Sequence, residues 1–404
     1  MKVAYFSEPQ LGGTFTFFQR LRPALANHGV DFHCISTVSA SAIRGTQFDL
    51  MDGVDVLPLG NNLADVTKQM IEHLQKSAFD IAMVLPAADI ASSNLPRYLP
   101  RTIRCVMRVP MMTRGAYAPA KAVAGHLNMI HAVSDRINND LTGRYSIPKE
   151  QVTIIYHGVD PIDSPDSLAA KSSSGTVRLL YAGRLWDTDK GVFLLPDIME
   201  RLCLAEQDVQ LTIAGGGPDA QELKRRFERA GVMDRVVMTG PLPLEKMNDY
   251  YAAADVFIFP SRFEGCGFAV LEAMAAGCAP VVSDIRGSLR VLVDDGYSGQ
   301  LARVGDPAAF AQSIIALTTD RNKLREFQQK AQQRVRDRFT LDRMAAEYAE
   351  SFKHVLTMHD LRQPVLSISN YVVPDAFRPT WRTWIPRPIK NIARTWMERR
   401  GISS

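Results

Sequence analysis

The stretch from Pro260 to Asp284, PSRFEGCGFAVLEAMAAGCAPVVSD, contains the pattern from which the fold of this chain is inferred. A short apolar run leads into it and a second one, Pro280–Ser283, closes it; both have the length and composition of buried strands. Between them we expect a helix that begins near Phe268 and stops at Gly277, a residue suited to a left-handed C-terminal cap. Strand, loop, helix and strand in this order predict a parallel sheet.

The same alternation continues on both sides of this stretch. Further strands of the second half are expected at Val177–Ala182, Val209–Ala214, Val236–Thr239 and Val256–Pro260. Strands of the first half are expected at Val3–Phe6, Phe32–Ser36, Val54–Leu57, Phe79–Leu85, Ile103–Val109 and Met129–Val133. These runs are continuously apolar, as parallel strands covered by helices on both faces should be. The chain is therefore predicted to be an α/β protein with two Rossmann-like, doubly wound domains.

A segment without periodicity separates the two predicted domains. PIDSPDSLAAKSSSG is rich in Ser, Pro and Asp, and we interpret 161–176 as a linker between a first domain, 1–160, and a second, 177–340. In doubly wound folds, ligands bind beyond the carboxyl ends of the strands. The loops that follow the predicted strands are therefore where functional residues are expected.

The composition limits the class of protein. The 404 residues are 46% hydrophobic and 22% charged, which excludes bulk disorder and fibrous repeats. No apolar run is long enough to span a membrane or to form the core of a signal peptide. The five cysteines include no CxxC pair, which favours a reducing compartment and argues against a zinc site. We therefore expect a soluble cytoplasmic protein.

Positive charge is concentrated in the last thirty residues, 375–404, which hold seven basic side chains and two acidic ones. The rest of the chain is close to neutral, so no nucleic-acid partner is expected. In this tail Ile389, Ile392, Ala393 and Trp396 recur at helical spacing among basic residues. Two alternatives follow: an interfacial helix that binds an anionic membrane surface, or a tail that packs on the protein's own first domain with its tryptophans buried.

Three loops of the second half carry candidate site residues. The first, AGRLWDTDKG, places Arg184 and Lys190 in one loop that leads into a helix. Two cations beside a helix N-terminus would suit a phosphate di-anion, although both side chains could simply be solvated. The second, IAGGGPD, permits close backbone approach of a ligand, or forms only a tight turn. It does not match GxGxxG, which argues against a nicotinamide dehydrogenase.

The third loop, within Pro260–Asp284, holds two acids. Glu264 lies in the loop and Glu272 about one turn into the following helix, so both are expected at the helix N-terminus. Carboxylates suit sugar hydroxyl groups because each oxygen accepts hydrogen bonds. The amides of Cys266, Gly267 and Phe268 would point at an anion bound there. Alternatively, Glu272 only complements the helix dipole and Glu264 is solvated.

Together these segments resemble the retaining glycosyltransferases of family 4 (glycosyl transferases group 1), which have GT-B architecture. HGVD at 157–160 and PQLGGT near the start match further motifs of that family, and the resemblance covers roughly residues 1–360. It implies two Rossmann-like domains that face each other across a cleft, an acceptor domain followed by a nucleotide-sugar domain. It also implies a helix at 341–360 that crosses back to the first domain, which leaves 361–404 as an additional tail.

The resemblance also implies roles for individual residues. Arg184 and Lys190 would hold the diphosphate of an NDP-sugar, Glu264 would contact the donor sugar, and Glu272 would bind the ribose. The implied donor-binding set is Gly12, Gly13, Arg184, Lys190, Glu264, Gly265, Cys266, Gly267, Phe268 and Glu272, with Arg184, Lys190 and Glu264 as the catalytic residues. The leaving phosphate would help to deprotonate the acceptor on the same face, so configuration is retained. No metal is expected, because the two cations would take its place.

One residue of the family pattern is missing. Many members carry a histidine near the end of the strand that corresponds to Ile103–Val109, whereas here RCVMRVPMMTRG offers Arg108 and Arg114. We therefore expect Arg108 or Arg114 to face the acceptor or a phosphate. His131 falls within a predicted strand, where a packed or surface histidine is the simpler interpretation.

The resemblance predicts a hexosyltransferase that moves a hexose from an NDP-sugar to a saccharide or lipid-linked glycan in bacterial cell-surface polysaccharide or glycolipid biosynthesis. If the tail binds lipid, the protein is peripheral on the inner face of the membrane. The alternative is a non-catalytic sugar-nucleotide-binding or scaffold subunit of a glycan assembly complex, which the missing histidine favours.

Overall fold

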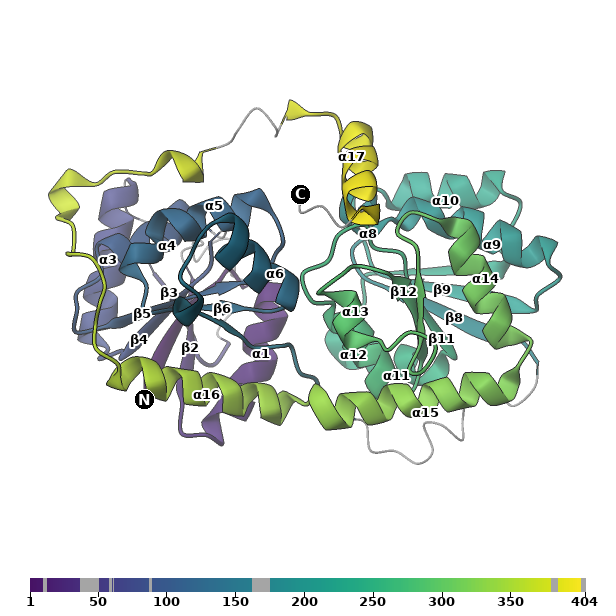
Figure 1. The fold of residues 1–404 in the computed structure, drawn as a ribbon, viewed down its shortest axis with the longest axis horizontal. Helices are drawn as coiled ribbons and strands as arrows, with labels where there is room; N and C mark the ends of the chain where they lie inside the picture. Colours follow the sequence, from purple (N-terminus) through teal and green to yellow (C-terminus); the bar gives the residue numbers. More distant parts are fainter. Residues whose placement is uncertain are drawn as a thin grey trace. The chain divides into compact units, whose positions relative to one another are not determined.

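The structure is a computed structural model, and it describes residues 1–9, 13–36, 51–57, 60, 62–86, 89–161, 175–378 and 384–400. The chain forms two compact units. Unit 1 consists of Met1–His157 and Leu341–Thr383, and unit 2 of Gly158–Thr340 and Trp384–Ser404. Each unit contains one sheet flanked by helices (Figure 1).

Unit 1 is built on a seven-stranded parallel sheet with the strand order β3-β2-β1-β4-β5-β6-β7. Its strands are β1 Lys2–Phe6, β2 Asp31–Ser36, β3 Val54–Val56, β4 Ile81–Val84, β5 Arg104–Val109, β6 Met129–Ala132 and β7 Val152–Ile154. Its helices are α1 Gly13–Ala26, α3 Leu63–Lys76, α4 Ile90–Asn94, α5 Arg114–Val123, α6 Asp135–Asn139 and α16 Leu341–Thr357.

Unit 2 is built on a six-stranded parallel sheet with the strand order β10-β9-β8-β11-β12-β13. Its strands are β8 Val177–Ala182, β9 Val209–Ala214, β10 Val236–Gly240, β11 Val256–Phe259, β12 Ala279–Ser283 and β13 Gln300–Ala302. Its helices are α8 Asp187–Lys190, α9 Leu195–Leu204, α10 Ala220–Arg229, α11 Leu244–Ala253, α12 Phe268–Ala275, α13 Leu289–Leu292, α14 Pro307–Thr318, α15 Arg321–Arg338 and α17 Arg387–Arg399.

The predicted α/β architecture is confirmed: both sheets are parallel and of the Rossmann type. Every strand expected from an apolar run is present, with ends that differ from the predicted ones by at most two residues. β7 and β13 were not predicted. Both are edge strands of three residues whose side chains are mostly half-buried, so neither produces a continuous apolar run.

The helix that follows unit 2 in sequence packs in unit 1. α16 buries one face against α1, and its Tyr348 ring lies 5.5 Å from the ring of Phe17 and 5.2 Å from that of His131. His131 itself is fully buried in β6, where burial and the charge of Arg108 lower its pKa to about 3. It is therefore a packed, neutral histidine, the simpler of the roles expected from the sequence.

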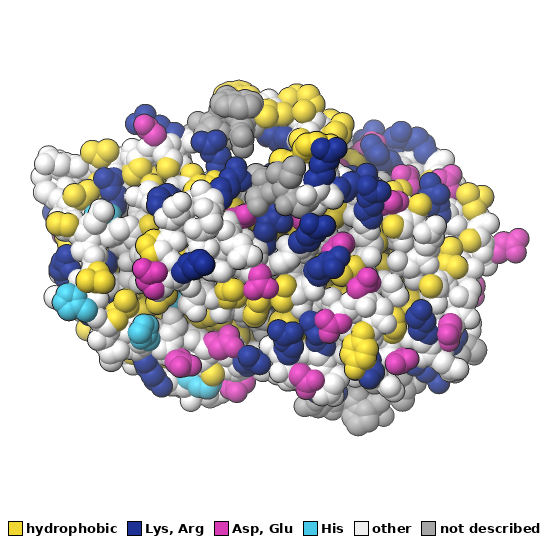
Figure 2. Space-filling model, in the orientation of Figure 1, with side chains coloured by type: hydrophobic (Ala, Val, Ile, Leu, Met, Phe, Trp, Pro, Cys, Tyr) yellow, Lys and Arg dark blue, Asp and Glu magenta, His cyan; other side chains and the backbone are white. Residues whose placement is uncertain are grey.

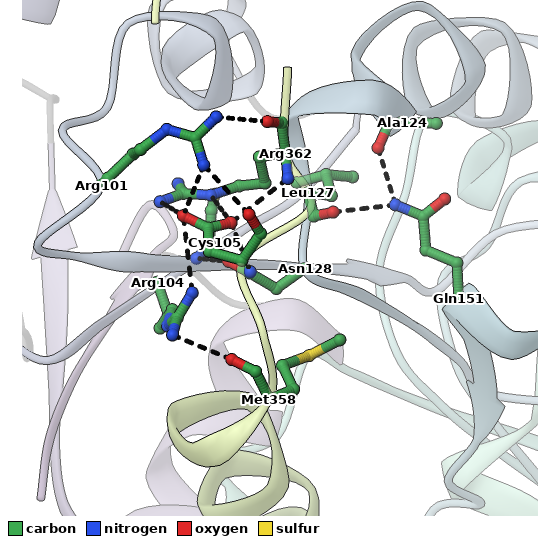
Figure 3. Close-up of polar contacts among 10 residues, drawn as sticks. Arg101, Arg104, Cys105, Ala124, Leu127, Asn128, Gln151, Met358 and Arg362 are labelled. Atoms are coloured by element: carbon green, nitrogen blue, oxygen red, sulfur yellow. Dashed lines mark hydrogen bonds and ion pairs between the residues drawn. The ribbon is translucent and has the colours of Figure 1, made fainter. Parts of the chain in front are cut away.

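The segment that follows α16 is held on unit 1 by a partly buried charge cluster. Arg101, Arg104 and Arg362 converge on the carboxylate of Asp360 (Figure 3), with nitrogen–oxygen distances of 3.4, 3.4 and 2.9 Å. Asn128 donates a further hydrogen bond to this carboxylate, at 3.1 Å. Burial alone would raise the pKa of the Asp360 carboxyl, but the hydrogen bonds and charge of Arg362 outweigh it and hold the pKa well below its usual range.

Asp360→Asn is expected to destabilise the chain by about 2 kcal/mol at pH 7, because it leaves three guanidinium groups without their shared anion. A depressed carboxyl pKa stabilises the fold above the unfolded pKa, and this contribution is lost as the pH falls through the folded value. The difference between the variant and the wild type should therefore be constant from pH 7 to about pH 5 and shrink below it. Urea unfolding of the full chain measures it.

Asp375→Asn is the matched control, because Asp375 is 92% exposed and its ion pair with Arg378 is solvated. We expect it to change the stability by less than about 0.5 kcal/mol at any pH. Equal effects of the two substitutions would show that the Asp360 cluster does not stabilise unit 1.

The C-terminal tail is divided between the two units. Residues 361–378 pack on unit 1, where Val372 accepts hydrogen bonds from Arg97 and Tyr98, whereas residues 384–400 group with unit 2. The alternative of a tail packed on the first domain is therefore correct for its first part only. α17 lies beside α8 in unit 2 (Figure 1), and it does so through its polar face. Trp396 is 49% exposed and Trp384, just before the helix, is 86% exposed, so neither indole is buried. Trp381 lies outside the described residues. None of the helices in the described ranges combines the length and hydropathy needed to cross a membrane.

Candidate functional site

The candidate site of unit 2 begins where β8 ends, in a loop that is built on the neighbouring glycine turn. The amides of Gly183 and Leu185 donate to the carbonyl groups of Ala214 and Gly216, at 3.0 and 2.8 Å. Gly215 has a φ of 148°, and a Cβ there would stand 2.0 Å from the carbonyl oxygen of Gly183. The three glycines therefore serve the close packing of two backbone segments, which fixes the loop that carries Arg184.

Lys190 and Glu264 come together as an ion pair between the loops that follow β8 and β11. The Lys190 ammonium contacts a carboxylate oxygen of Glu264, and the two side chains are only 17% and 14% exposed. The ammonium also lies 4.9 Å from the ring centre of Phe259, the last residue of β11. Two of the predicted donor-binding side chains thus contact each other in a half-buried environment, in the segments that follow the carboxyl ends of the adjacent strands β8 and β11.

Backbone contacts fix the geometry of this pair. The amides of Arg262 and Phe263 donate to the carbonyl oxygen of Asp189, at 2.9 and 3.1 Å. Gly191, the C-cap of α8, has a φ of 61°, and a Cβ there would lie 2.2 Å from the carbonyl oxygen of Pro260. The loop after β11 therefore rests directly on α8, and a side chain at the Gly191 position would separate them.

Arg184 lies close to this pair but is exposed. Its carbonyl oxygen accepts a hydrogen bond from the Tyr181 hydroxyl group at 3.0 Å, and its guanidinium stands 5.7 Å from the Trp186 ring centre. Burial, and then the negative charge of Glu264, raise the pKa of Tyr181, while Arg184 opposes the rise. Both charged groups are thus within electrostatic reach of one tyrosine, and the exposed guanidinium of Arg184 is available to an anionic ligand.

The loop leads into helical structure in two steps. Arg184 lies just before α8, a single turn whose last residue is Lys190, and a 3-10 turn at Val192–Leu194 and then α9 follow directly. Gly191 adopts the left-handed conformation that ends the helix, and the Asp187 carboxylate accepts a hydrogen bond from the amide of Phe193 at 2.9 Å. At the start of the following helical turn, the amide of Phe193 is thus already paired with a carboxylate.

The N-terminus of α12 is the second anion-suited element. Gly267 is its N-cap with a φ of 78°, and no side chain caps the helix. The hydroxyl group of Ser288 donates to the carbonyl oxygens of Glu264 and Gly265, at 2.7 and 3.1 Å, which fixes the loop in front of the helix. Cys266 is buried in this loop and Phe268 is the first helical residue, as predicted.

Glu272 lies on α12 and is oriented by a residue that the sequence did not single out. The Tyr251 hydroxyl group, on α11, donates to a carboxylate oxygen of Glu272 at 2.6 Å. Glu272 is half-buried. The hydrogen bond from Tyr251 therefore fixes the orientation of this carboxylate.

The predicted site residues of unit 1, unlike those of unit 2, form no hydrogen bond or ion pair with one another in the described part of the chain. Gly13 is the first residue of α1, and Gly12 lies outside the described residues. Arg114 is exposed at the start of α5. Arg108 is 1% exposed in β5; its guanidinium donates to His157 at 2.6 Å and stacks 3.9 Å above the Phe17 ring centre.

The Arg108–His157 contact is an unexpected feature of unit 1. Burial, and then the charge of Arg108, hold the pKa of His157 well below its usual range, so this imidazole is neutral and its Nε2 accepts the hydrogen bond. His157 entered the sequence analysis only as part of the HGVD motif. Two further nitrogens of the Arg108 guanidinium have no hydrogen-bond partner in the described part of the chain.

The sequence analysis did not single out several residues that build the unit 2 site, and no local sequence pattern marks most of them. Asp187, Asp189 and Arg262 act through contacts between loops far apart in sequence, which a local pattern does not reveal. Tyr251 and Tyr181 look like ordinary core aromatics. In the described ranges, no three His, Cys, Asp or Glu side chains are grouped as metal ligands would be.

Comparisons with known proteins match most of unit 2 and the fold of both units. Residues 176–320, most of unit 2, match the family model described as glycosyl transferases group 1. The D-inositol 3-phosphate glycosyltransferase of Xylanimonas cellulosilytica is 32% identical over 197 residues, which are 45% of this chain and 46% of that protein. The glycogen synthase of Mycobacterium tuberculosis is 26% identical over 264 residues, 65% of this chain and 63% of that protein. The chain thus spans about half to two thirds of the length of these relatives.

Among solved structures, Anabaena Alr3699/HepE in complex with UDP-glucose is similar with a TM-score of 0.71 and 17% sequence identity, over 88% of this chain and all of that one. The lipopolysaccharide outer core galactosyltransferase WaaB is similar with a TM-score of 0.67 and 17% identity, over 87% and 100%. Both likenesses concern the fold. The chain therefore has the two Rossmann-like sheets of GT-B glycosyltransferases, and its residues 176–320, which hold the Lys190–Glu264 pair, match glycosyl transferases group 1.

Proposed function

We propose that this protein is a retaining glycosyltransferase of family 4 that moves a hexose from an NDP-sugar to a saccharide or lipid-linked glycan acceptor. The observation that carries the proposal is the Lys190–Glu264 pair with exposed Arg184 nearby, placed at the carboxyl ends of β8 and β11. This edge of a doubly wound sheet is where such folds bind ligands. The pair also lies within the residues that match glycosyl transferases group 1.

Transfer from an NDP-sugar requires positive charge beside the diphosphate of the donor. Lys190 and Arg184 would bind it and stabilise the negative charge that grows on the leaving nucleotide as the glycosidic bond breaks. In the free protein Glu264 holds the Lys190 ammonium in place, and with donor bound its carboxylate would also accept hydrogen bonds from the sugar. Glu272, oriented by Tyr251, would bind the ribose hydroxyls.

The amides at the start of α12, with Gly265, Cys266, Gly267 and Phe268, would contact the β-phosphate or the sugar. The leaving phosphate would take the acceptor proton on the face from which it departs, so the new bond has the configuration of the old one. Because side chains supply the cationic charge, we expect turnover to continue in excess EDTA.

The acceptor side is proposed to lie in unit 1. Exposed Arg114 is the cation there that can meet an acidic acceptor directly. Buried Arg108 would act through His157, whose ring it holds neutral and oriented.

A screen of NDP-hexoses against the full chain tests the proposed function. The matching donor should raise the melting temperature, because it binds only the folded protein, and should be hydrolysed slowly without an acceptor. The Arg184→Ala/Lys190→Ala variant should lose both effects. A donor that binds without turnover, even with crude glycan acceptors, would favour the non-catalytic sugar-nucleotide-binding or scaffold subunit. The absence of any binding would contradict both functions.

We also propose that the protein is cytoplasmic and peripheral on an anionic membrane surface, through the tail at 375–404. The apolar side chains of α17 face away from unit 2: Ile389 is 57% exposed, Ile392 72% and Trp396 49%. Figure 2 shows hydrophobic side chains beside Lys and Arg over α17, at the top of the view. The guanidinium of Arg400 stacks 4.3 Å from the Trp396 ring centre. Indole, apolar and basic groups on one helix face suit the headgroup region.

Co-sedimentation with phosphatidylglycerol vesicles tests this proposal, with phosphatidylcholine vesicles for comparison. The wild type should sediment with the anionic vesicles only, and Ile392→Ser/Trp396→Ser should remain in solution. Equal sedimentation of the wild type and of this variant would show that the apolar face of α17 does not bind the membrane. Binding would place the acceptor at the inner membrane face, as in bacterial surface-polysaccharide or glycolipid biosynthesis.

A further inference from the structure

α17 contacts unit 2 through its polar side chains, on the side opposite its exposed apolar residues. The side-chain amide of Asn391 donates to the carboxylate of Asp187 at 2.8 Å. The guanidinium of Arg394 donates to the carboxylate of Asp189 at 2.9 Å and lies 4.8 Å from the ring centre of Phe263. An amphipathic helix more often buries its apolar face, so this arrangement indicates a specific role for the polar contacts.

The same helix also contacts the loop after β11. The Arg262 side chain is only 13% exposed, and its guanidinium donates to the hydroxyl group of Thr395 at 3.1 Å. It also lies 3.7 Å from the carboxylate of Asp187. α17 therefore connects two loops that are far apart in sequence.

These contacts flank the candidate donor-binding pair on both sides. Asp189, which Arg394 contacts, directly precedes Lys190, and Phe263, on which Arg394 packs, directly precedes Glu264. A shift of α17 would therefore move both members of the pair, each through a neighbouring backbone position.

The contacts also neutralise charge. α8 contributes two carboxylates, of Asp187 and Asp189, within a few residues of Lys190. Uncompensated, these acids would compete for the ammonium and repel a diphosphate. Arg394 balances one of them, and Asn391 and Arg262 satisfy the other.

We propose that α17 positions the Lys190–Glu264 pair, with Asn391 and Arg394 as positioning residues for diphosphate binding. This inference rests on the proposed function, because it concerns the affinity of the same site for its nucleotide. It adds that the C-terminal helix, outside the residues that match glycosyl transferases group 1, sets that affinity.

The inference is tested by measuring the affinities of the full chain for UDP and UMP by titration calorimetry. If the donor screen selects a guanine nucleotide, GDP and GMP are used in their place. Asn391→Ala/Arg394→Ala should weaken UDP binding about tenfold, because Lys190 is no longer held toward the β-phosphate. UMP, which lacks that phosphate, should bind within about twofold of wild type. Arg400→Ala is the matched control: it removes a cation from the end of α17 that contacts neither loop, and should leave both affinities unchanged.

Arg394→Lys keeps the charge opposite Asp189 and should restore most of the UDP affinity. An unchanged UDP affinity in the double variant would overturn the inference, and so would an equal loss for UDP and UMP, which indicates general loosening. If the wild type binds no nucleotide, the proposed function is wrong. The positioning role of α17 is then tested separately, by comparing amide hydrogen exchange in the wild type and in the double variant. Faster exchange in 184–191 and 260–264 of the double variant supports it, and unchanged exchange overturns it.

Discussion

Lys190→Ala is expected to lower kcat/KM for the NDP-sugar by about 10³-fold, the largest effect of a single side chain in unit 2. The Lys190 side chain is only 17% exposed, so its charge would act on the leaving diphosphate with little screening by water. Most of the loss should be in kcat, because negative charge on the nucleotide grows as the glycosidic bond breaks. Initial rates over a range of donor concentrations separate kcat from KM.

Lys224→Ala is the control for this variant, because it removes an exposed lysine of α10 that takes no part in the contacts described for the candidate site. It should keep kcat/KM within about twofold of wild type. The melting temperature of Lys190→Ala must also be measured, since the substitution leaves the half-buried carboxylate of Glu264 without its partner. A well-folded Lys190→Ala protein with a nearly normal kcat/KM would exclude this residue from the reaction.

Gly215→Ala is expected to destabilise unit 2 by about 4 kcal/mol or more. A Cβ at this position would stand 2.0 Å from the carbonyl oxygen of Gly183, which is backbone and cannot move aside as a flexible side chain would. The φ of 148° adds strain for any residue other than glycine. Urea or thermal unfolding gives the loss of stability, and the surviving folded protein should bind nucleotide weakly because the Arg184 loop is displaced.

Gly231→Ala separates the steric effect from the backbone effect. Gly231 has a φ of 67°, and a Cβ there would have no neighbour within 4 Å in the described structure. Only the left-handed conformation then costs energy, about 1 kcal/mol. Similar losses for the two variants would show that the contact between the loops after β8 and β9 does not hold the site together.

The strands could be predicted from the sequence because parallel strands covered on both faces are continuously apolar. β8 and β9 were predicted to the residue, whereas β7 and β13, at sheet edges and half-exposed, carry no such run. Gly277 was predicted as a left-handed cap and has a φ of 75°. Patterns within one segment were therefore sufficient for most of the fold.

The candidate site could be predicted only in part. Arg184, Lys190, Glu264 and Glu272 stand out because charged side chains follow predicted strands. The short length of α8 could not be predicted, since Gly191 ends it through contact with Pro260, a residue far along the chain. Likewise, the spacing of Ile389, Ile392 and Trp396 shows that α17 is amphipathic, but not which of its faces contacts the protein. That depends on Asp187 and Asp189, two hundred residues earlier.

A crystal structure of the full chain with UDP tests most directly whether unit 2 holds one pyrophosphate site. The β-phosphate is expected within hydrogen-bond distance, about 3.2 Å, of the Lys190 ammonium, with the Arg184 guanidinium on the same diphosphate and the ribose hydroxyls on Glu272. A well-ordered UDP bound elsewhere, with its phosphates touching neither Arg184 nor Lys190, would contradict the assignment of this site.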